Sequence, residues 1–549
     1  MEKGSGKISR RNFVLRSALG SAGLVIANDI VSSHLVAETS KAAAPTQAQS
    51  FDTEVPNRYV EQNSFLTEKA NTNAPPSFDS IRARLPVPVW PNRPDVIDCY
   101  WYTWRTAFGN LHGVTAANGF VSPYIDPAFN GHIFMWDSVF MTMFGRYASA
   151  AFHFQGTLDN FYRKQHKNGF ICREIRESDG TDVFDEYDPS STGPNIMPWG
   201  EWEYFLNFGD ESRLKKVFFP LLAYYQWFRE FRSWPDGSYF STGWGCGMDN
   251  QPRVPAGFDP AWSSAHMSWI DTTLQQIFAG KTLIGMAQHL NEMEEVRGIQ
   301  QEVDQLTEYV NTHMWDDKTA FYYDRYQDGS LSHLMSIAGY WALLAGVVPE
   351  KSMSRFIAHL ENTNEFNRLH RVPSIATSDP GYVPEGGYWR GGVWSPTTYM
   401  VLRGLSRCHK DTLAHEIALN DLNNVVEVFS QTGMLWENYS PDKVQGNDTK
   451  NMVGWTGLTP TAELLEYVFG LRPDVPHNTL VWDVRLTDEF GVEQYPFAGK
   501  GVISLHCEKR KSATDVPAIS VESRFPFELV LLWTGGKKHV KIPHGKTTY

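Results

Sequence analysis

Apolar residues recur at steps of three and four along most of the chain between about residues 95 and 470. This spacing places apolar side chains on one face of a helix. The clearest stretches are "VIDCYWYTWRTAFGNL", "ESRLKKVFFPLLAYYQWFREFR", "IDTTLQQIFAGKTLIGMAQHL" and "TLAHEIALNDLNNVVEVFS". Together with weaker stretches near 156–166, 199–208 and 350–361, the pattern predicts about twelve helices.

The connections between these predicted helices alternate in character. Some are short, such as "FGDES", while others are long and rich in Gly, Pro, Trp and Asp, namely 168–198, 235–264, 363–392 and 433–457. Long connections inside a compact domain usually carry function. We therefore expect a mainly α fold in which six helical hairpins close into an (α/α)6 toroid. Its inner helices and long loops would form one cleft.

The pattern changes after about residue 475. Short runs of β-branched and aromatic residues, such as "NTLVWDVRL", "KGVISLHCEK" and "FELVLLW", alternate with turn residues. These runs predict a small all-β domain over 475–549, with a hairpin turn at "TGGKK". The helical domain is then expected over 86–474.

The N-terminus resembles a twin-arginine export signal. Arg10 and Arg11 stand in "SRRNF", and a moderately apolar stretch follows over 17–27. That stretch is too short and too rich in small residues to span a membrane. Twin-arginine signals are addresses read by the export machinery. We expect residues 1–37 to be a signal peptide, 38–85 a flexible leader, and the protein to be periplasmic or secreted.

Composition narrows the class of ligand. The net charge of −13 argues against nucleic acid or an anionic membrane surface as the partner. Aromatic residues make up 14% of the chain, and flat rings suit both cores and the apolar faces of sugars. The five cysteines are scattered, which indicates neither a disulfide framework nor a zinc site. No cofactor is expected, although a structural calcium ion held by loop carboxylates and carbonyls stays open.

Two isolated carboxylates lie in long, aromatic-rich loops: Asp249 in "GWGCGMDNQPR" and Glu437 in "MLWENYS". The first stretch alone also reads as an ordinary turn. As a pair, however, two carboxylates suit glycoside hydrolysis, where one is a general acid and the other stays ionised. Burial beside Cys246 and Met248 would keep Asp249 protonated, and donors beside Glu437 would keep that group ionised.

Other chemistries find less support in the sequence. It contains no G-x-S-x-G elbow, phosphate-binding P-loop or H-E-x-x-H motif. Three alternatives to a glycosidase stay open. They are a polysaccharide lyase, which needs a Tyr or His base, a sugar epimerase, which needs facing His bases, and a carbohydrate-binding protein without activity.

Four motifs occur in the order found in glycoside hydrolase family 63. They are "MWDSVF", "GMDNQPR", "GYWRGGVWSPTTYMVLRGL" and "WENYSPDK…GWTGLTP". This chain resembles that family's processing α-glucosidases and their bacterial relatives, such as mannosylglycerate hydrolases. The trehalases of family 37 share the architecture. The resemblance implies an (α/α)6 toroid and inverting, exo-acting hydrolysis of α-linked glucosides or related sugars.

The resemblance also implies roles for individual residues. Asp249 would be the general acid and Glu437 the general base. The substrate-binding set would comprise Trp136, Asp137, Arg173, Glu174, Asn250, Trp389, Arg390, Trp436 and Trp455. The chain departs from its relatives in "GWGCGM" before the acid, which indicates a change on the leaving-group side, and at Gly392, where relatives often carry Pro.

Overall fold

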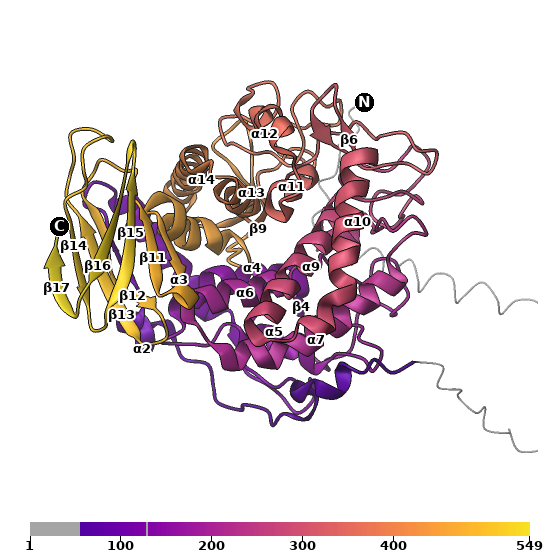
Figure 1. Ribbon diagram of the computed structural model, residues 1–549, viewed down its shortest axis with the longest axis horizontal. Helices are drawn as coiled ribbons and strands as arrows, with labels where there is room; N and C mark the ends of the chain where they lie inside the picture. The colour runs from indigo at the N-terminus through magenta and orange to yellow at the C-terminus, as the bar shows by residue number, and fades with distance from the viewer. Residues whose placement is uncertain (1–54, 128–129) are drawn as a thin grey trace, which may run out of the picture. The chain divides into compact units, whose positions relative to one another are not determined.

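Long helices fill the middle of the chain, and strands gather towards its C-terminus, in a computed structural model that describes residues 55–127 and 130–549 (Figure 1). Four of the clearest predicted helices are confirmed as α3 (Pro94–Gly109), α7 (Glu211–Phe231), α9 (Ile270–Leu290) and α14 (Asp411–Thr432). Asn57–Tyr549 form one unit. The predicted signal peptide and the leader as far as residue 54 lie outside the described residues.

One set of helices packs neighbour to neighbour. The helix α4 packs against α6, α6 against α9, α9 against α11, and α11 against α13. Next to α13 lies the short helix η8, which packs back against α4. The bounds are Met135–Gly145 for α4, Met197–Phe208 for α6, Trp341–Ala345 for α11, Ser395–Arg407 for α13 and Thr456–Leu458 for η8. All eleven residues of α4 are buried, as expected for a helix enclosed by others.

A second set of helices packs outside the first. The helix α5 (Gly156–Arg163) contacts α4, α7 contacts α6 and α9, α10 (Arg297–His313) contacts α9, and α14 contacts α13. The helix α10 buries only Ile299, Val303, Leu306 and Val310, which recur at steps of four, three and four. This single apolar stripe is what a helix with one solvent-facing side requires. The helix α12 (Glu350–Ala358) shows the same one-sided burial.

The last predicted helix has an unusual form. Thr459–Val468, labelled η9, is a π-helix, and it packs against α3 and α14. Pro460 is its second residue, and all ten of its residues are buried. π-helical segments are rare in proteins, and those that occur often lie near functional sites.

Two sheets make up the strand-rich part (Figure 1). The five-stranded sheet has the order β1-β12-β13-β14-β17, and the four-stranded sheet has the order β10-β11-β15-β16. The aromatic rings of Phe497 and Phe527 connect them at 5.1 Å between centroids. The bounds are Val87–Val89 (β1), Leu471–Asp474 (β10), Thr479–Asp483 (β11), Phe490–Phe497 (β12), Gly501–Cys507 (β13), Ile519–Ser523 (β14), Phe527–Trp533 (β15), Gly536–Ile542 (β16) and Gly545–Thr548 (β17).

The predicted turn at "TGGKK" is confirmed. The strands β15 and β16 pair antiparallel, with Trp533 opposite Gly536, and Gly535 in the turn has φ +83°. Glycine reaches that left-handed angle without steric cost. The strands nevertheless cross the predicted domain boundary at residue 475. The earlier strand β1 belongs to the five-stranded sheet, and the earlier strand β10 belongs to the four-stranded sheet.

Residues 57–85 differ from the flexible leader expected over 38–85. They contain the short helices η1 (Val60–Gln62), η2 (Ser64–Thr67), α2 (Phe78–Ile81) and η3 (Arg82–Arg84). Phe65 and Leu85 are completely buried, and the ring of Phe65 lies 5.0 Å from that of Tyr162 in α5. These scattered apolar residues lack a clear period, which is why their burial could not be predicted.

Among the described residues, no helix has both the length and the apolar character needed to cross a bilayer.

Candidate active site

The loop of Asp249 is built on a short capped helix. Thr242 accepts a hydrogen bond from the backbone of Gly245 at 2.9 Å and so caps α8 (Gly243–Cys246). Gly247 then ends α8 in the left-handed conformation with φ +80°. A Cβ at Gly247 would lie 3.5 Å from Nε1 of Trp136, so the indole of Trp136 lies directly against this loop. Asp249 follows and is half-buried.

Asn250 joins this loop to the glycine-rich stretch around Trp389. Its Oδ1 accepts from the backbone N–H of Trp389 at 2.9 Å, and its Nδ2 donates to the carbonyl of Gly387 at 3.1 Å. Gly387 has a positive φ of +51°. The side chain next to Asp249 therefore fixes the position of a loop more than 130 residues further along the chain.

The same loop also binds the side chain of Glu437. The hydroxyl of Tyr388 donates to Oε1 of Glu437 at 3.1 Å, and the backbone N–H of Thr449 donates to Oε2 at 3.2 Å. The Glu437 side chain is buried, with 1% of its surface exposed. Donors aimed at both oxygens stabilise the ionised form of a buried carboxyl group.

These bonds form a continuous connection between the two predicted catalytic carboxylates. It runs from Asp249 through its neighbour Asn250 to Trp389, and from Tyr388 beside it to Glu437. The strand β8 (Trp436–Tyr439) also bridges to this loop, since Val393 and Tyr439 exchange backbone hydrogen bonds at 2.9 Å. The structure thus brings the second, third and fourth sequence motifs together.

An aromatic group lies behind Glu437. The rings of Trp389 and Trp394 stack at 3.9 Å with an interplanar angle of 1°, and the Trp455 ring meets Trp394 edge-on at 5.5 Å. Trp455 also donates from Nε1 to the carbonyl of Glu437 at 3.1 Å. Tryptophan rings held this rigidly fix the backbone that carries the predicted base.

Among the described residues, three buried indole N–H groups have no acceptor, namely those of Trp104, Trp136 and Trp389. Trp104 lies in α3, outside the four motifs, whereas Trp136 and Trp389 belong to the first and third motifs and are 5% and 0% exposed. A buried N–H without a partner costs free energy, and it can be satisfied by a ligand. Sugar hydroxyls are suitable acceptors, which fits the predicted substrate-binding role of both residues.

The first motif lies beside a small two-stranded sheet. The strand β4 (His132–Phe134) leads directly into α4 with Trp136 and Asp137, and it pairs with β5 (Glu174–Arg176). The carbonyl of Arg173 accepts from the backbone of Met135 at 2.8 Å. Arg173 and Glu174 therefore lie at the start of α4, and Glu174 pairs with Nδ1 of His132 at 2.7 Å.

Two predicted binding residues make polar contacts with residues outside the four motifs. Trp436 donates from Nε1 to Oγ1 of Thr432 at 3.2 Å, and the ammonium of Lys450 lies 5.4 Å over its ring. The structure thus places the Trp436 ring at the C-terminal end of α14. Arg390 donates from Nε to the carbonyl of Gly381 at 3.0 Å.

The sequence did not identify Arg253 as a functional residue. Its guanidinium is 1% exposed and pairs with Asp271 at 2.7 Å and with Asp324 at 2.6 Å. It also approaches the sulfur of Cys246 at 3.7 Å. Cys246 therefore packs against Arg253, and burial raises the pKa of its thiol. Only the position of Arg253 in "GMDNQPR" could have drawn attention to it, because its partners are distant in sequence.

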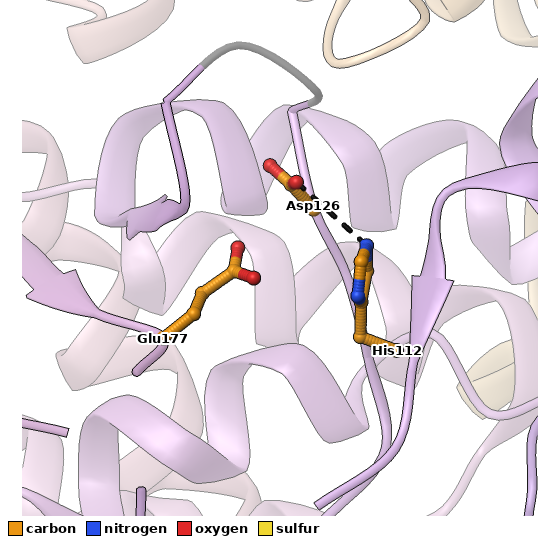
Figure 2. Close-up of side chains that lie close together, drawn as sticks. All are labelled: His112, Asp126 and Glu177. Carbon is orange, nitrogen blue, oxygen red and sulfur yellow. Dashed lines mark ion pairs between the residues drawn. The ribbon is translucent and has the colours of Figure 1, made fainter. Parts of the chain in front are cut away.

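One group of described side chains could hold a metal ion (Figure 2). The ligand atoms of His112, Asp126 and Glu177 all lie within 4.8 Å of one another, and His112 pairs with Asp126 at 3.7 Å. One imidazole and two carboxylates are typical ligands of zinc or manganese, whereas calcium prefers oxygen ligands. None of the three was predicted as a site residue, because their positions are widely spaced in the sequence.

A family model described as the mannosylglycerate hydrolase MGH1-like glycoside hydrolase domain matches residues 131–456. An uncharacterized protein of Borreliella burgdorferi is 23% identical over 413 residues, covering 73% of this chain and 84% of that protein. A probable mannosyl-oligosaccharide glucosidase of Schizosaccharomyces pombe is 26% identical over 285 residues, covering 45% of this chain and 34% of its own length. This chain thus matches about a third of the fungal protein.

Solved structures share the fold. The GH63 mannosylglycerate hydrolase from Thermus thermophilus, in complex with glucose, has a TM-score of 0.53 at 18% identity, covering 65% of this chain and 98% of its own. The neutral trehalase from Saccharomyces cerevisiae has a TM-score of 0.52 at 14% identity, covering 65% of this chain and 76% of its own. These structures support a mainly helical fold of the kind predicted from the apolar pattern.

Proposed function

The chain belongs to the mannosylglycerate hydrolase MGH1-like family of GH63 glycoside hydrolases, and from this premise we propose that it is an exported, exo-acting enzyme that inverts the anomeric centre of α-linked glucosides or related sugars. The observation that carries the proposal is the pair of hydrogen bonds from Trp389 to Asn250 and from Tyr388 to Glu437. They link the segment that carries Asp249 to the carboxylate of Glu437, the two groups that this chemistry needs.

In the proposed reaction, Asp249 is the general acid. Its protonated carboxyl donates to the glycosidic oxygen as the bond from that oxygen to the anomeric carbon breaks. Glu437 accepts a proton from water while the water oxygen bonds to the anomeric carbon from the opposite side. The donors at Tyr388 and Thr449 favour the ionised Glu437 that this step requires.

The buried indole donors support a substrate-binding role for Trp136 and Trp389. We assign the same role to Asp137, Arg173, Glu174 and Asn250 from their places beside these two groups. The proposal of a substrate-binding role is weaker for Trp436 and Arg390, because their side chains bond to Thr432 and Gly381.

We further propose that the helical part is an (α/α)6 toroid. The succession of contacts from α4 through α6, α9, α11 and α13 to η8, and from η8 back to α4, supports this arrangement. The strands that follow are proposed to support the helical part, since Asn57–Tyr549 form one unit.

The decisive experiment is proton NMR of the first-formed product. The substrate panel comprises 4-nitrophenyl α-glucoside, 4-nitrophenyl α-mannoside, α-linked glucose disaccharides and mannosylglycerate. An inverting enzyme releases the β-anomer first from an α-glycoside. A first-formed α-anomer would contradict inversion, and an unsaturated uronide from an acidic polysaccharide would favour a lyase instead.

The catalytic assignment has a separate test. The Asp249→Asn and Glu437→Gln variants keep side-chain size while removing the acid and the base, and each should lower kcat by about 10²–10⁴. Glu385→Gln is the matched control, because Glu385 lies in the neighbouring loop and pairs with Lys443 at 2.6 Å. Full activity of the Asp249 variant with loss in the Glu385 variant would move the acid to Glu385.

We also propose export through the twin-arginine machinery, on the strength of Arg10 and Arg11 in "SRRNF". Replacement of both by Lys should retain the protein in the cytoplasm of a bacterium that uses this machinery. Cell fractionation with an antibody against the chain measures the outcome. Unchanged export of the Lys-Lys variant would contradict the proposal.

A further inference from the structure

An aromatic platform lies next to the loop of Asp249. It consists of Trp244, Trp262 and Phe184, with the guanidinium of Arg173 beside them. The ring centroids of Trp244 and Trp262 are 3.8 Å apart, and Phe184 meets Trp244 edge-on at 5.9 Å. Arg173 lies 4.6 Å from the Phe184 ring and 5.9 Å from the Trp244 ring.

The platform is attached to the backbone of the proposed acid. The N–H of Trp244 donates to the carbonyl of Ala261 at 3.0 Å. A Cβ at Gly243 would lie 2.3 Å from the carbonyl of Pro260 and 2.8 Å from the carbonyl of Asp249. Only glycine lets these two segments approach so closely. Trp262 is therefore held at a fixed place relative to Asp249.

Trp262 is the one exposed tryptophan among the described residues, at 39% of its surface. The turn that presents it is ordered, because Oδ1 of Asp259 accepts from the backbone of Ala261 at 2.8 Å. A large ring kept in water by an ordered turn forgoes the free energy that its burial would provide. An exposed ring next to a binding site is well suited to cover an apolar ligand face.

The charge of Arg173 is already balanced. Its guanidinium pairs with Glu174 at 3.2 Å, and its Nε donates to the carbonyl of Ser190 at 2.7 Å. Glu174 thus compensates the charge of Arg173, and the three rings supply the apolar area of the platform. Their planes are tilted by 42° between Trp244 and Trp262 and by 82° between Phe184 and Trp244, so the exposed ring of Trp262 is the face that a ligand can cover.

We propose that this platform binds the leaving group, and that the leaving group is a neutral sugar ring. The inference rests on the proposed function, in which Asp249 protonates the leaving-group oxygen. We place the platform on the leaving-group side because its backbone packs against that of Asp249, the proposed proton donor to the leaving group. A pyranose offers an apolar C–H face that matches an aromatic ring, whereas a small carboxylate such as glycerate offers none. The substrate class is thus an α-linked oligosaccharide.

The experiment compares substrates with and without a sugar as leaving group. One series contains α-glucosyl fluoride and α-mannosyl fluoride, and the other contains α-linked disaccharides and trisaccharides of the same sugars. In Trp262→Ala, we expect kcat/KM to fall about tenfold for the oligosaccharides, mainly through KM, and to be unchanged for the fluorides. Phe258→Ala is the matched control, since Phe258 is 42% exposed in the same loop and faces His266.

The outcomes separate the two proposals. An equal loss on fluorides and oligosaccharides, or no loss on either, overturns the platform while leaving the hydrolase intact. A wild type faster on mannosylglycerate than on every oligosaccharide also overturns it. If the wild type hydrolyses no member of either series, the proposed function fails. In that case, calorimetric titration with α-linked trisaccharides tests whether the platform binds sugar. Undiminished binding by Trp262→Ala contradicts the platform, and weakened binding supports it.

Discussion

The hydroxyl of Tyr388 donates to Oε1 of Glu437 at 3.1 Å, and the next residue along the chain, Trp389, donates from its backbone to Asn250, the neighbour of Asp249. Two adjacent residues thus link the proposed base to the loop of the proposed acid. A displacement of this glycine-flanked segment would change the separation of the two carboxyl groups. Inverting hydrolysis depends on that separation, which is about 6.5–9.5 Å in such enzymes.

Tyr388→Phe removes the donor to Glu437 and keeps the ring. We expect kcat to fall about tenfold with little change in KM, because the ionised carboxylate loses a charge-assisted hydrogen bond. The acidic limb of the pH profile of kcat/KM should also move to higher pH, since the ionised form is less stabilised. Steady-state kinetics from pH 4 to 9 measure both effects.

Tyr382→Phe is the control for this variant. The hydroxyl of Tyr382 donates to Asp442 at 2.8 Å, so the substitution removes a similar bond in the same loop without touching Glu437. It should leave the pH profile in place. Equal shifts in both variants would mean that general loosening of the loop, rather than the bond to Glu437, sets the profile.

Asn250→Ala removes both bonds to the Trp389 loop. We expect kcat/KM to fall about 10–100-fold, because misplacement of a catalytic group by about 1 Å can cost that much. The apparent Tm should fall only slightly, since the side chain is half-buried and each lost bond contributes about 1 kcal/mol. Unchanged kinetics with a large drop in Tm would reveal a purely structural role.

Asp249→Asn should discriminate between leaving groups. An alkoxide leaving group needs a proton from the acid, whereas fluoride needs far less assistance. We therefore expect turnover of an α-linked disaccharide to fall by about 10²–10⁴ and turnover of the matching glycosyl fluoride to fall much less. Equal losses on both substrates would indicate that Asp249 does not act as the proton donor.

The apolar period predicted the long helices because each has a continuous buried stripe, as in α10 with Ile299, Val303, Leu306 and Val310. Apolar residues also recur at helical spacing throughout 333–348. In the structure, this stretch forms only the short η6 (Ile337–Tyr340) and α11, which ends at Gly346 with φ +62°. The apolar period alone does not mark these helix boundaries.

The sequence identified the motifs of the candidate site but not the bonds between them. Tyr388 and Glu437 are 49 positions apart, and Asn250 and Trp389 are 139 apart. Pairings at that distance depend on how the helices pack, which the apolar period does not specify. The roles carried over from the family resemblance therefore remain predictions, and the bonds give them a physical basis.

Glu463 provides a test of stability that is separate from catalysis. It is completely buried in the π-helix η9, and burial, followed by the nearby Asp421, raises the pKa of its carboxyl well above the ordinary value of 4.5. In the unfolded chain the group ionises above that value, while the folded protein keeps it protonated. Folding then takes up a proton, so between the ordinary pKa and the raised pKa this group disfavours folding by about 1.4 kcal/mol more for each pH unit.

Glu463→Gln keeps the shape of the side chain and removes that proton uptake. We measure the apparent Tm of the variant and of the wild type at one scan rate from pH 5 to pH 9. The Tm of the variant should rise relative to that of the wild type as pH increases, because only the wild type must take up a proton on folding. Glu489→Gln, at a half-exposed carboxyl that pairs with His506 at 3.0 Å, should show no comparable gain. A constant difference between Glu463→Gln and the wild type over this range would mean that Glu463 is ionised in the folded protein.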